Sequence, residues 1–141
     1  MADLKVMDLF DAMTRSIKEM FPDHDVYGED VEQALTDGAF QCLFVSDNHR
    51  MRESRREHLP VVFEVLYYPK NGREEGMSVL DDLYRALKFI TVREGVTLRG
   101  WDFTAGYTDG VVHTTIRYDA YVQPASDGSL MQMYTLLKEA T

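Results

Sequence analysis

LRGWDFTAGYTDGVVHTTIRYDAYVQ, residues 98–123, is the most informative stretch of the sequence. Two runs rich in β-branched and aromatic residues, 98–107 and 111–123, lie on either side of Thr108-Asp109-Gly110. An Asp-Gly pair between two such runs is the strongest short-range signal of a β-hairpin. Apolar and polar side chains alternate along the second run, which favours a strand with one drier face. The stretch therefore predicts an antiparallel hairpin within a larger sheet.

Three further strands are predicted upstream of the hairpin. The near-continuous apolar run 39–46 is typical of a central strand that is covered on both faces. The run 59–68 is rich in Val, Phe and Tyr and ends at the turn residues 69–72. Pro60 cannot donate a backbone hydrogen bond, so we expect it among the first residues of this strand or on an unpaired side. Val26-Tyr27 is expected to form a short strand.

Helices are predicted at three places. Between residues 3 and 21 the apolar side chains recur at three- and four-residue steps, and Pro22 ends the pattern. Residues 77–90 repeat Leu, Tyr and Ile at helical spacing, with Gly95 as a plausible stop. A shorter helix is expected within residues 129–141.

The predicted elements follow the order α-β-β-β-α-β-β-α. This order indicates an α+β fold in which helices pack against a largely antiparallel or mixed β-sheet. No internal repeat, Gly/Ser-rich linker or break in composition divides the chain. Residues 1–141 are therefore expected to form one domain.

The charge of the chain is acidic and unevenly distributed. The sequence has 15 Lys and Arg against 24 Asp and Glu, a formal net charge of −9. Residues 1–40 hold ten acidic and three basic residues, net −7, and residues 41–141 hold fourteen and twelve, net −2. An acidic chain repels the phosphate backbone, so specific nucleic-acid binding is not expected. Complementary patches at opposite ends are what a head-to-tail ring needs.

The single Cys42 excludes an internal disulfide and a cysteine-only metal site. It lies in an apolar run, where a free thiol behaves as a small buried hydrophobe. The N-terminal residues lack the pattern of a signal peptide, and no run reaches the roughly 18–20 apolar residues of a membrane span. We therefore expect a soluble, intracellular product without a membrane partner.

No catalytic, cofactor-binding or metal-binding motif is found. The sequence has no phosphate-binding glycine loop, no nucleophile elbow and no His-Glu-x-x-His pair. His24, with Asp23 and Asp25, is the one cluster that resembles an acid-base or metal site, but charged residues after a helix end are usually solvated. Trp101 alternates with Phe103 in a predicted strand, which favours a packed face. An enzyme is not predicted, although a small intracellular enzyme with an unrecognised site remains the alternative of a different class.

The segment 47–58, DNHRMRESRREH, is a basic island in an acidic protein. Arginine is favoured where planar, bidentate contacts to carboxylates or phosphates are made, so this loop or extended hairpin is the candidate contact surface. The alternative is a solvated β-extension whose charges discourage edge pairing. Glu53 and Glu57 would repel phosphates, and no aromatic residue lies within the run, so nucleic acid is the weaker partner.

Several segments together resemble one known family. They are Met20-Phe21-Pro22, His24-Asp25-Val26-Tyr27-Gly28-Glu29, the strand 40–45, Phe63-Glu64-Val65-Leu66-Tyr67-Tyr68-Pro69, Leu98-Arg99-Gly100-Trp101 and Asp109-Gly110-Val111-Val112-His113. This succession resembles the tail terminator family of contractile-tailed phages and related defective prophages of Gram-positive bacteria. The resemblance covers roughly residues 1–123 and involves no catalytic signature.

The resemblance implies a structural virion protein without a cofactor. Protomers would form a homo-oligomeric, sixfold ring on the last ring of the tail tube, halt tube growth, anchor the sheath and meet the neck or head-completion protein. DNA would pass through the ring, and assembly would take place in the host cytoplasm. Another head-tail connector or neck ring protein is the alternative. The expected interface residues are Arg50, Arg52, Arg55 and Arg56, with Glu29, Asp30 and Glu32 as acidic counterparts.

Overall fold

The computed structural model describes residues 4–29, 37–47, 50–51 and 57–122. Its elements are α1 (Val6–Met20), β1 (Val26–Tyr27), β2 (Ala39–Asp47), β3 (Arg50–Met51), β4 (Glu57–Tyr68), α2 (Arg73–Ser78), α3 (Leu80–Lys88), β5 (Phe89–Arg93), β6 (Val96–Thr108) and β7 (Val111–Val122). The α+β class predicted from the sequence is confirmed. The helix expected within 129–141 lies outside the described residues.

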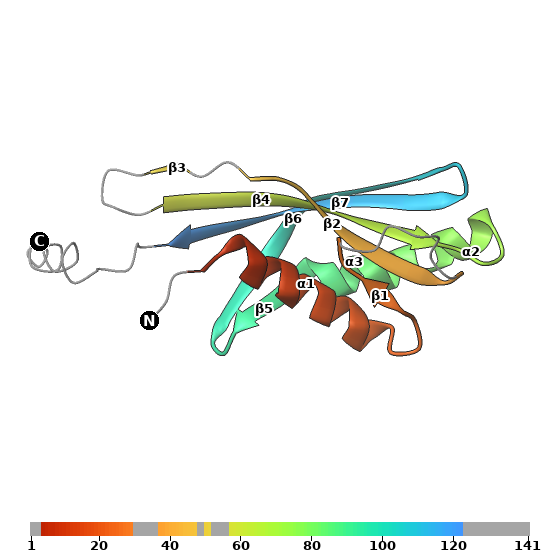
Figure 1. Ribbon diagram of the computed structural model, residues 1–141, viewed down its shortest axis with the longest axis horizontal. Helices are drawn as coiled ribbons and strands as arrows, with labels where there is room; N and C mark the ends of the chain where they lie inside the picture. Colours follow the sequence, from red (N-terminus) through yellow and green to blue (C-terminus); the bar gives the residue numbers. More distant parts are fainter. Residues whose placement is uncertain (1–3, 30–36, 48–49, 52–56, 123–141) are drawn as a thin grey trace, which may run out of the picture.

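The described strands form one mixed sheet with the order β1-β2-β4-β7-β6-β5, and β3 pairs with β4 beside this path. Only the β1–β2 pair is parallel, and the other pairs are antiparallel. The helices lie together beneath the sheet in Figure 1, and no described element covers its upper face. The fold therefore has two layers, with one helix-covered face and one open face.

The predicted hairpin is confirmed by the pairing of β6 with β7. Thr108 pairs with Val111, and the turn residues Asp109 and Gly110 both have positive φ, 54° and 80°. Positive φ at both central residues is the requirement of a type I′ turn, which suits Asp-Gly. On its other side β7 pairs with β4 over eleven residue pairs, from Glu57–Val122 to Tyr67–Val112. These two strands form the middle of the sheet.

Pro60 lies near the start of β4, as predicted. The pairing of β2 with β4 ends at Val61, and that of β3 with β4 begins at His58. Pro60 falls between these two stretches and pairs with Asp119 of β7. A place near the start of a strand suits a residue that cannot donate a backbone hydrogen bond.

The core lies between the helices and the covered face of the sheet. Helix α1 buries Leu9, Ala12, Met13 and Ile17, the apolar stripe that the sequence predicts. The alternate residues of β4 from Leu59 to Tyr67 lie on the same side, each at most 1% exposed. Cys42 is also buried in the core, and burial raises the pKa of its thiol to about 12. The thiol therefore stays protonated near neutral pH and is not reactive.

The segment predicted as a helix over 77–90 is divided differently. Two helices meet at Val79, and the second ends at Lys88. Phe89 already has an extended backbone and begins β5, in which Thr91 and Val92 are β-branched. Ile90 keeps its predicted burial, but it does so by pairing with Leu98 of β6. Tertiary pairing thus overrides the helical spacing of this apolar residue.

In the described part of the chain, no helix combines the length and the apolar character needed to span a membrane.

Candidate assembly surface

The open face of the sheet carries polar and charged side chains that pair with one another across the strands. His113 Nδ1 lies 3.1 Å from Glu64 Oε2, and the hydroxyls of Thr104 and Thr115 are 2.7 Å apart. Such cross-strand pairs stabilise a sheet surface that has no helix above it. These polar side chains in the middle of the open face therefore find hydrogen-bond partners within the chain.

Arg117 is the centre of the second group of charges on this face. Its guanidinium lies 3.1 Å from the carboxylate of Asp119 and also binds Asp102. Asp119 in turn lies 3.2 Å from His58 Nε2. One cation is thus compensated by two carboxylates, which leaves this group without a free positive charge for a partner.

An aromatic–basic patch lies where β5 meets β6; it consists of Lys88, Phe89, Arg99 and Trp101. Phe89 pairs with Arg99, and the two aromatic side chains are 53% and 43% exposed. The Arg99 guanidinium lies 4.4 Å from the centre of the Trp101 ring, and Lys88 Nζ lies 5.8 Å from that of Phe89. Exposed Trp and Arg together are typical of the central residues of protein interfaces.

The structure corrects the expectation that Trp101 and Phe103 share a packed face. The register of β6 against β7 shifts between Trp101 and Thr104, and Asp102 in this irregular stretch has a φ of 57°. Phe103 consequently packs against the core and contacts Tyr84, whereas Trp101 stays 43% exposed. A bulge changes which face successive residues occupy, so strict alternation fails here.

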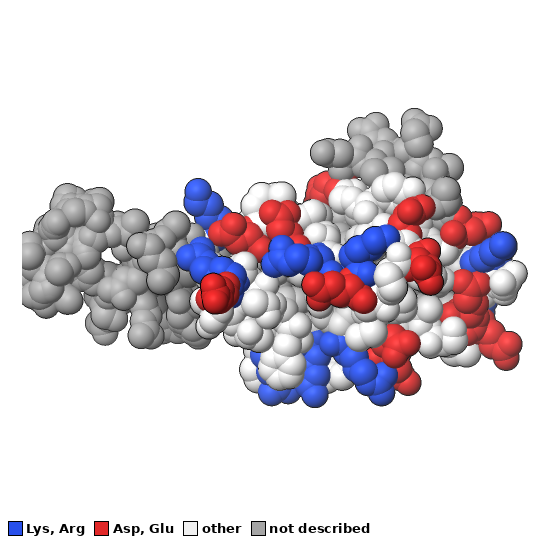
Figure 2. All heavy atoms as spheres, turned by 90° about the horizontal axis from the view of Figure 1, so that it is seen from below, with Lys and Arg blue, Asp and Glu red and all other residues white. Residues whose placement is uncertain are grey.

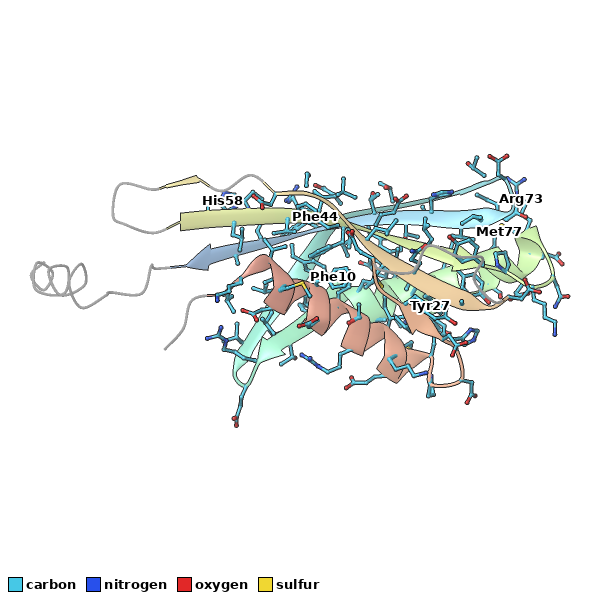
Figure 3. The ribbon with its side chains drawn as sticks, in the orientation of Figure 1. Phe10, Tyr27, Phe44, His58, Arg73 and Met77 are labelled. Carbon is cyan, nitrogen blue, oxygen red and sulfur yellow. The ribbon has the colours of Figure 1, made fainter. Side chains whose placement is uncertain are left out.

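An apolar groove of about 530 Å³ lies between the first half of α1 and β2. Figure 3 shows Phe10 of α1 and Phe44 of β2 on its two sides. Met7 and Phe44 are large apolar residues that stay exposed there. Glu29 also lines the groove, and its carboxylate accepts a hydrogen bond from the backbone N–H of Phe44.

Charged side chains occupy backbone groups near both edges of the sheet. The pairing of β1 with β2 involves Phe40 and Gln41. Beyond it, the Glu29 carboxylate accepts a hydrogen bond from the backbone N–H of Phe44. Arg15 of α1 donates to the carbonyl of Thr91 in the edge strand β5, at 2.9 Å. A charged side chain on an edge discourages the addition of a further strand. The described edges are therefore poor sites for pairing with another chain.

A second concave site, of about 290 Å³, lies beside β1 and contains the predicted cluster around His24. We call it the acidic concavity; its lining residues are Asp23, His24, Asp25, Asp37, Gly38, Lys70, Asn71 and Glu75. Four carboxylates here face one lysine and one histidine. The sequence grouped only the first three of these residues, because the others arrive from distant segments.

His24 is fixed by packing, contrary to the solvated-loop interpretation. Its Nδ1 lies 2.6 Å from the carbonyl oxygen of Gly38, so Nδ1 is the protonated donor. The ring contacts those of Phe21, Phe40 and Tyr67, with centres 5.5–5.9 Å apart. His24 thus holds the segment before β2 against the core.

Glu75 closes the acidic concavity and serves a structural purpose. It accepts hydrogen bonds from the Tyr67 hydroxyl at 2.5 Å and from the backbone N–H of Asn71 at 2.7 Å. The bond from Tyr67 is the largest of the effects that lower the pKa of Glu75. Among the residues that the structure describes, no group of three His, Cys, Asp or Glu side chains is arranged to hold a metal ion.

The interface residues predicted from the sequence are described only in part. Arg50 lies in β3, and its backbone pairs with that of His58 in β4. This antiparallel pairing is the arrangement of a hairpin extension. Glu29 lies at the edge of β2, with its carboxylate bonded within the chain. Arg52, Arg55, Arg56, Asp30 and Glu32 lie outside the described residues, so their grouping stays a prediction.

The described residues form a small two-layer α+β fold with one open sheet face that carries paired charges. The chain belongs to the phage tail terminator protein family, whose model matches residues 8–129. It is accordingly a structural protein of a phage-type tail. No curated protein matches its sequence.

A solved structure supports the fold. A chain described as part of the virion of a native gene transfer agent particle superimposes with a TM-score of 0.53 at 12% sequence identity. The match covers 81% of this chain and 93% of that one. At this level of identity the similarity concerns the fold.

Proposed function

We propose that this protein is the protomer of a sixfold ring that caps the tail tube, ends the polymerisation of tube and sheath and joins the tail to the neck. The observation that carries the proposal is the match of the tail terminator family model to residues 8–129. The open sheet face supports it, because a protomer that works by docking needs surface that its own helices do not cover.

The mechanism that follows is geometric. One face of the ring matches the end of the tube, and the opposite face offers no site for another tube subunit. Tube growth requires such a site at every step, so the first complete ring stops it. The partners are further copies of the chain, the tube protein, the sheath protein of a contractile tail and the neck or head-completion protein, and the ring leaves a passage for DNA.

Deletion of the gene in a particle-producing strain tests the proposal. We expect tails of abnormal length, because nothing would end tube polymerisation, and expression of the intact chain should restore the normal length. Electron microscopy of the released particles measures both. Tails of normal length without heads would instead indicate a head-completion or other neck protein and would overturn the terminator function.

The arginine segment gives a second test of the assembly. Reversal of two of its charges, Arg55→Glu with Arg56→Glu, is expected to prevent ring formation and to lengthen tails, because the bidentate contacts become repulsions. A matched control is Lys5→Glu with Arg73→Glu, which reverses two exposed cations elsewhere. Lys5 immediately precedes α1, and an acidic side chain at a helix N-terminus interacts favourably with the helix dipole. Unchanged ring formation and tail length in the first variant would show that the segment is not the contact.

A further inference from the structure

Three described cations lie on aromatic rings with no described carboxylate within 4 Å; one is Arg73, over Tyr107, and the other two belong to one patch. Lys88 and Arg99 of the aromatic–basic patch make cation–π contacts, and no described carboxylate lies within 4 Å of either charge. The guanidinium of Arg117, whose residue pairs with Trp101 across β6 and β7, is in contrast paired with two acids. In a chain of net charge −9, two uncompensated cations in one place are conspicuous.

The rings beneath these cations add to the binding capacity of the patch. Phe89 and Trp101 are about half exposed, and burial of such rings contributes most of the energy at interface centres. Stacking on Trp101 restricts the Arg99 guanidinium, so less conformational entropy is lost when it binds a carboxylate. The patch therefore fits an acidic protein surface that also offers apolar contacts.

The acidic concavity carries the complementary charge. Asp23 and Asp37 are exposed and form no hydrogen bond or ion pair with described residues. The His24 ring lines the concavity beside them, packed against the buried Phe21 ring. On the face seen from below, Figure 2 shows basic side chains along part of the lower margin and mostly acidic ones at the right-hand end, with both signs side by side across the middle.

The two sites lie at opposite edges of one sheet. Phe89 begins β5, the last strand in the order, and Asp23 and Asp25 immediately precede β1, the first strand. Complementary sites on opposite edges produce head-to-tail contacts, and these close into a ring when each step turns by a constant angle. Strand pairing is a weaker route, because Glu29 binds a backbone N–H of β2 beyond its pairing with β1, and Arg15 binds a backbone carbonyl of the edge strand β5.

We propose that the aromatic–basic patch of one protomer docks onto the acidic concavity of a second copy of this chain. The inference rests on the proposed ring and names the surfaces that form it. Lys88 and Arg99 pair with Asp23 and Asp37 of the neighbour, while Phe89 and Trp101 are buried between the two subunits. Electrostatic complementarity of this kind sets the register of the contact and excludes the face-to-face arrangement of like charges.

A charge exchange between two variants tests the contact. The first variant carries Lys88→Glu and Arg99→Glu, and the second carries Asp23→Lys and Asp37→Lys. Each is expressed in the producing strain that lacks the native gene, and tails of normal length are counted. Each variant alone is expected to lower the count by at least about tenfold, because every contact then brings like charges together.

Expression of both variants together is expected to restore the count to within about threefold of the intact chain. In an alternating ring with an even number of subunits, every reversed patch meets a reversed concavity and every native patch meets a native concavity. A single chain with all four substitutions should behave in the same way. The control Lys5→Glu with Arg73→Glu should leave the count unchanged.

Several outcomes would overturn the proposal. Either pair of substitutions could leave the tails normal, or the two variants could fail together as they fail alone. Tails of normal length that lack packaged DNA in the first variant would assign the patch to DNA contact. If deletion of the native gene leaves tail length unchanged, the proposed function itself fails; if deletion lengthens tails and the charge reversals do not, only the docking contact is wrong.

The weaker pairs Lys88→Gln with Arg99→Gln and Asp23→Asn with Asp37→Asn replace any variant whose melting temperature falls.

Discussion

Phe40→Ala is expected to lower the free energy of unfolding by about 3–5 kcal/mol, the usual cost of emptying a fully buried aromatic site. The side chain is 0% exposed, and its ring centre lies 4.7 Å from those of Phe21 and Tyr67. Phe21 follows α1, Phe40 lies on β2 and Tyr67 on β4, so the ring joins three segments. The cavity would remain, because residues held by three different elements cannot all move inward.

Thermal and denaturant unfolding measure this loss. For a domain of this size the melting temperature should fall by about 10–20 °C. Phe44→Ala is the matched control on the same strand, because its side chain is 43% exposed and should cost about 1 kcal/mol or less. Phe40→Leu keeps most of the volume and should lie between the two. Equal losses for Phe40→Ala and Phe44→Ala would contradict the description of the core.

The same three segments show what the sequence could predict. The apolar stripe of α1 and the β-branched run of β4 each form the predicted element. The continuous apolar run 39–46 also forms a strand, β2, but the prediction that it is covered on both faces is wrong, because Phe44 and Val45 are 43% and 48% exposed. The Asp-Gly turn was equally clear, because few residue pairs accept positive φ at both positions. Local signals of this strength persist in the folded chain, since tertiary contacts agree with them.

β5 and the bulge at Asp102 could not be predicted in this way. Phe89–Arg93 continues an apolar helical pattern, and only its pairing with β6 makes it a strand. The shift at Asp102 likewise arises from the register between β6 and β7. Both features depend on where a partner strand lies, and one segment of sequence carries no information on that.

The candidate surface depends on the same two features. Without β5, Phe89 would not lie beside Arg99, and without the bulge Trp101 and Phe103 would share a face. The acidic excess of residues 1–40 was visible in the sequence, but its concavity also uses Lys70, Asn71 and Glu75. Composition therefore indicated the sign of the charge, and the fold determined which carboxylates stand together. The role of the arginine segment 47–58 rests on composition alone and stays a prediction.

Gly100→Ala is expected to cost at least about 1–3 kcal/mol, the usual penalty for overfilling a tight contact. A Cβ atom at this position would lie 2.9 Å from the carbonyl oxygen of Leu87 and closer still to Ile116 Cδ1. Neither neighbour can move easily. Ile116 is 1% exposed, and the Leu87 carbonyl accepts the buried hydroxyl of Tyr118 at 2.6 Å. Helix α3 and strand β6 would therefore have to separate by a few tenths of an ångström.

Gly100→Ala should also impair assembly through the aromatic–basic patch, because Gly100 lies between Arg99 and Trp101. Separation of α3 from β6 would also move Lys88 away from Arg99, and normal-length tails should decrease even at temperatures where the variant is fully folded. Gly106→Ala is the control on the same strand, since a Cβ there meets no atom within 4 Å and its φ is not positive. Removal of a glycine's backbone freedom should make that variant neutral or slightly more stable. Equal melting temperatures and tail counts for the two variants would show that the close approach of α3 to β6 does not hold the patch in place.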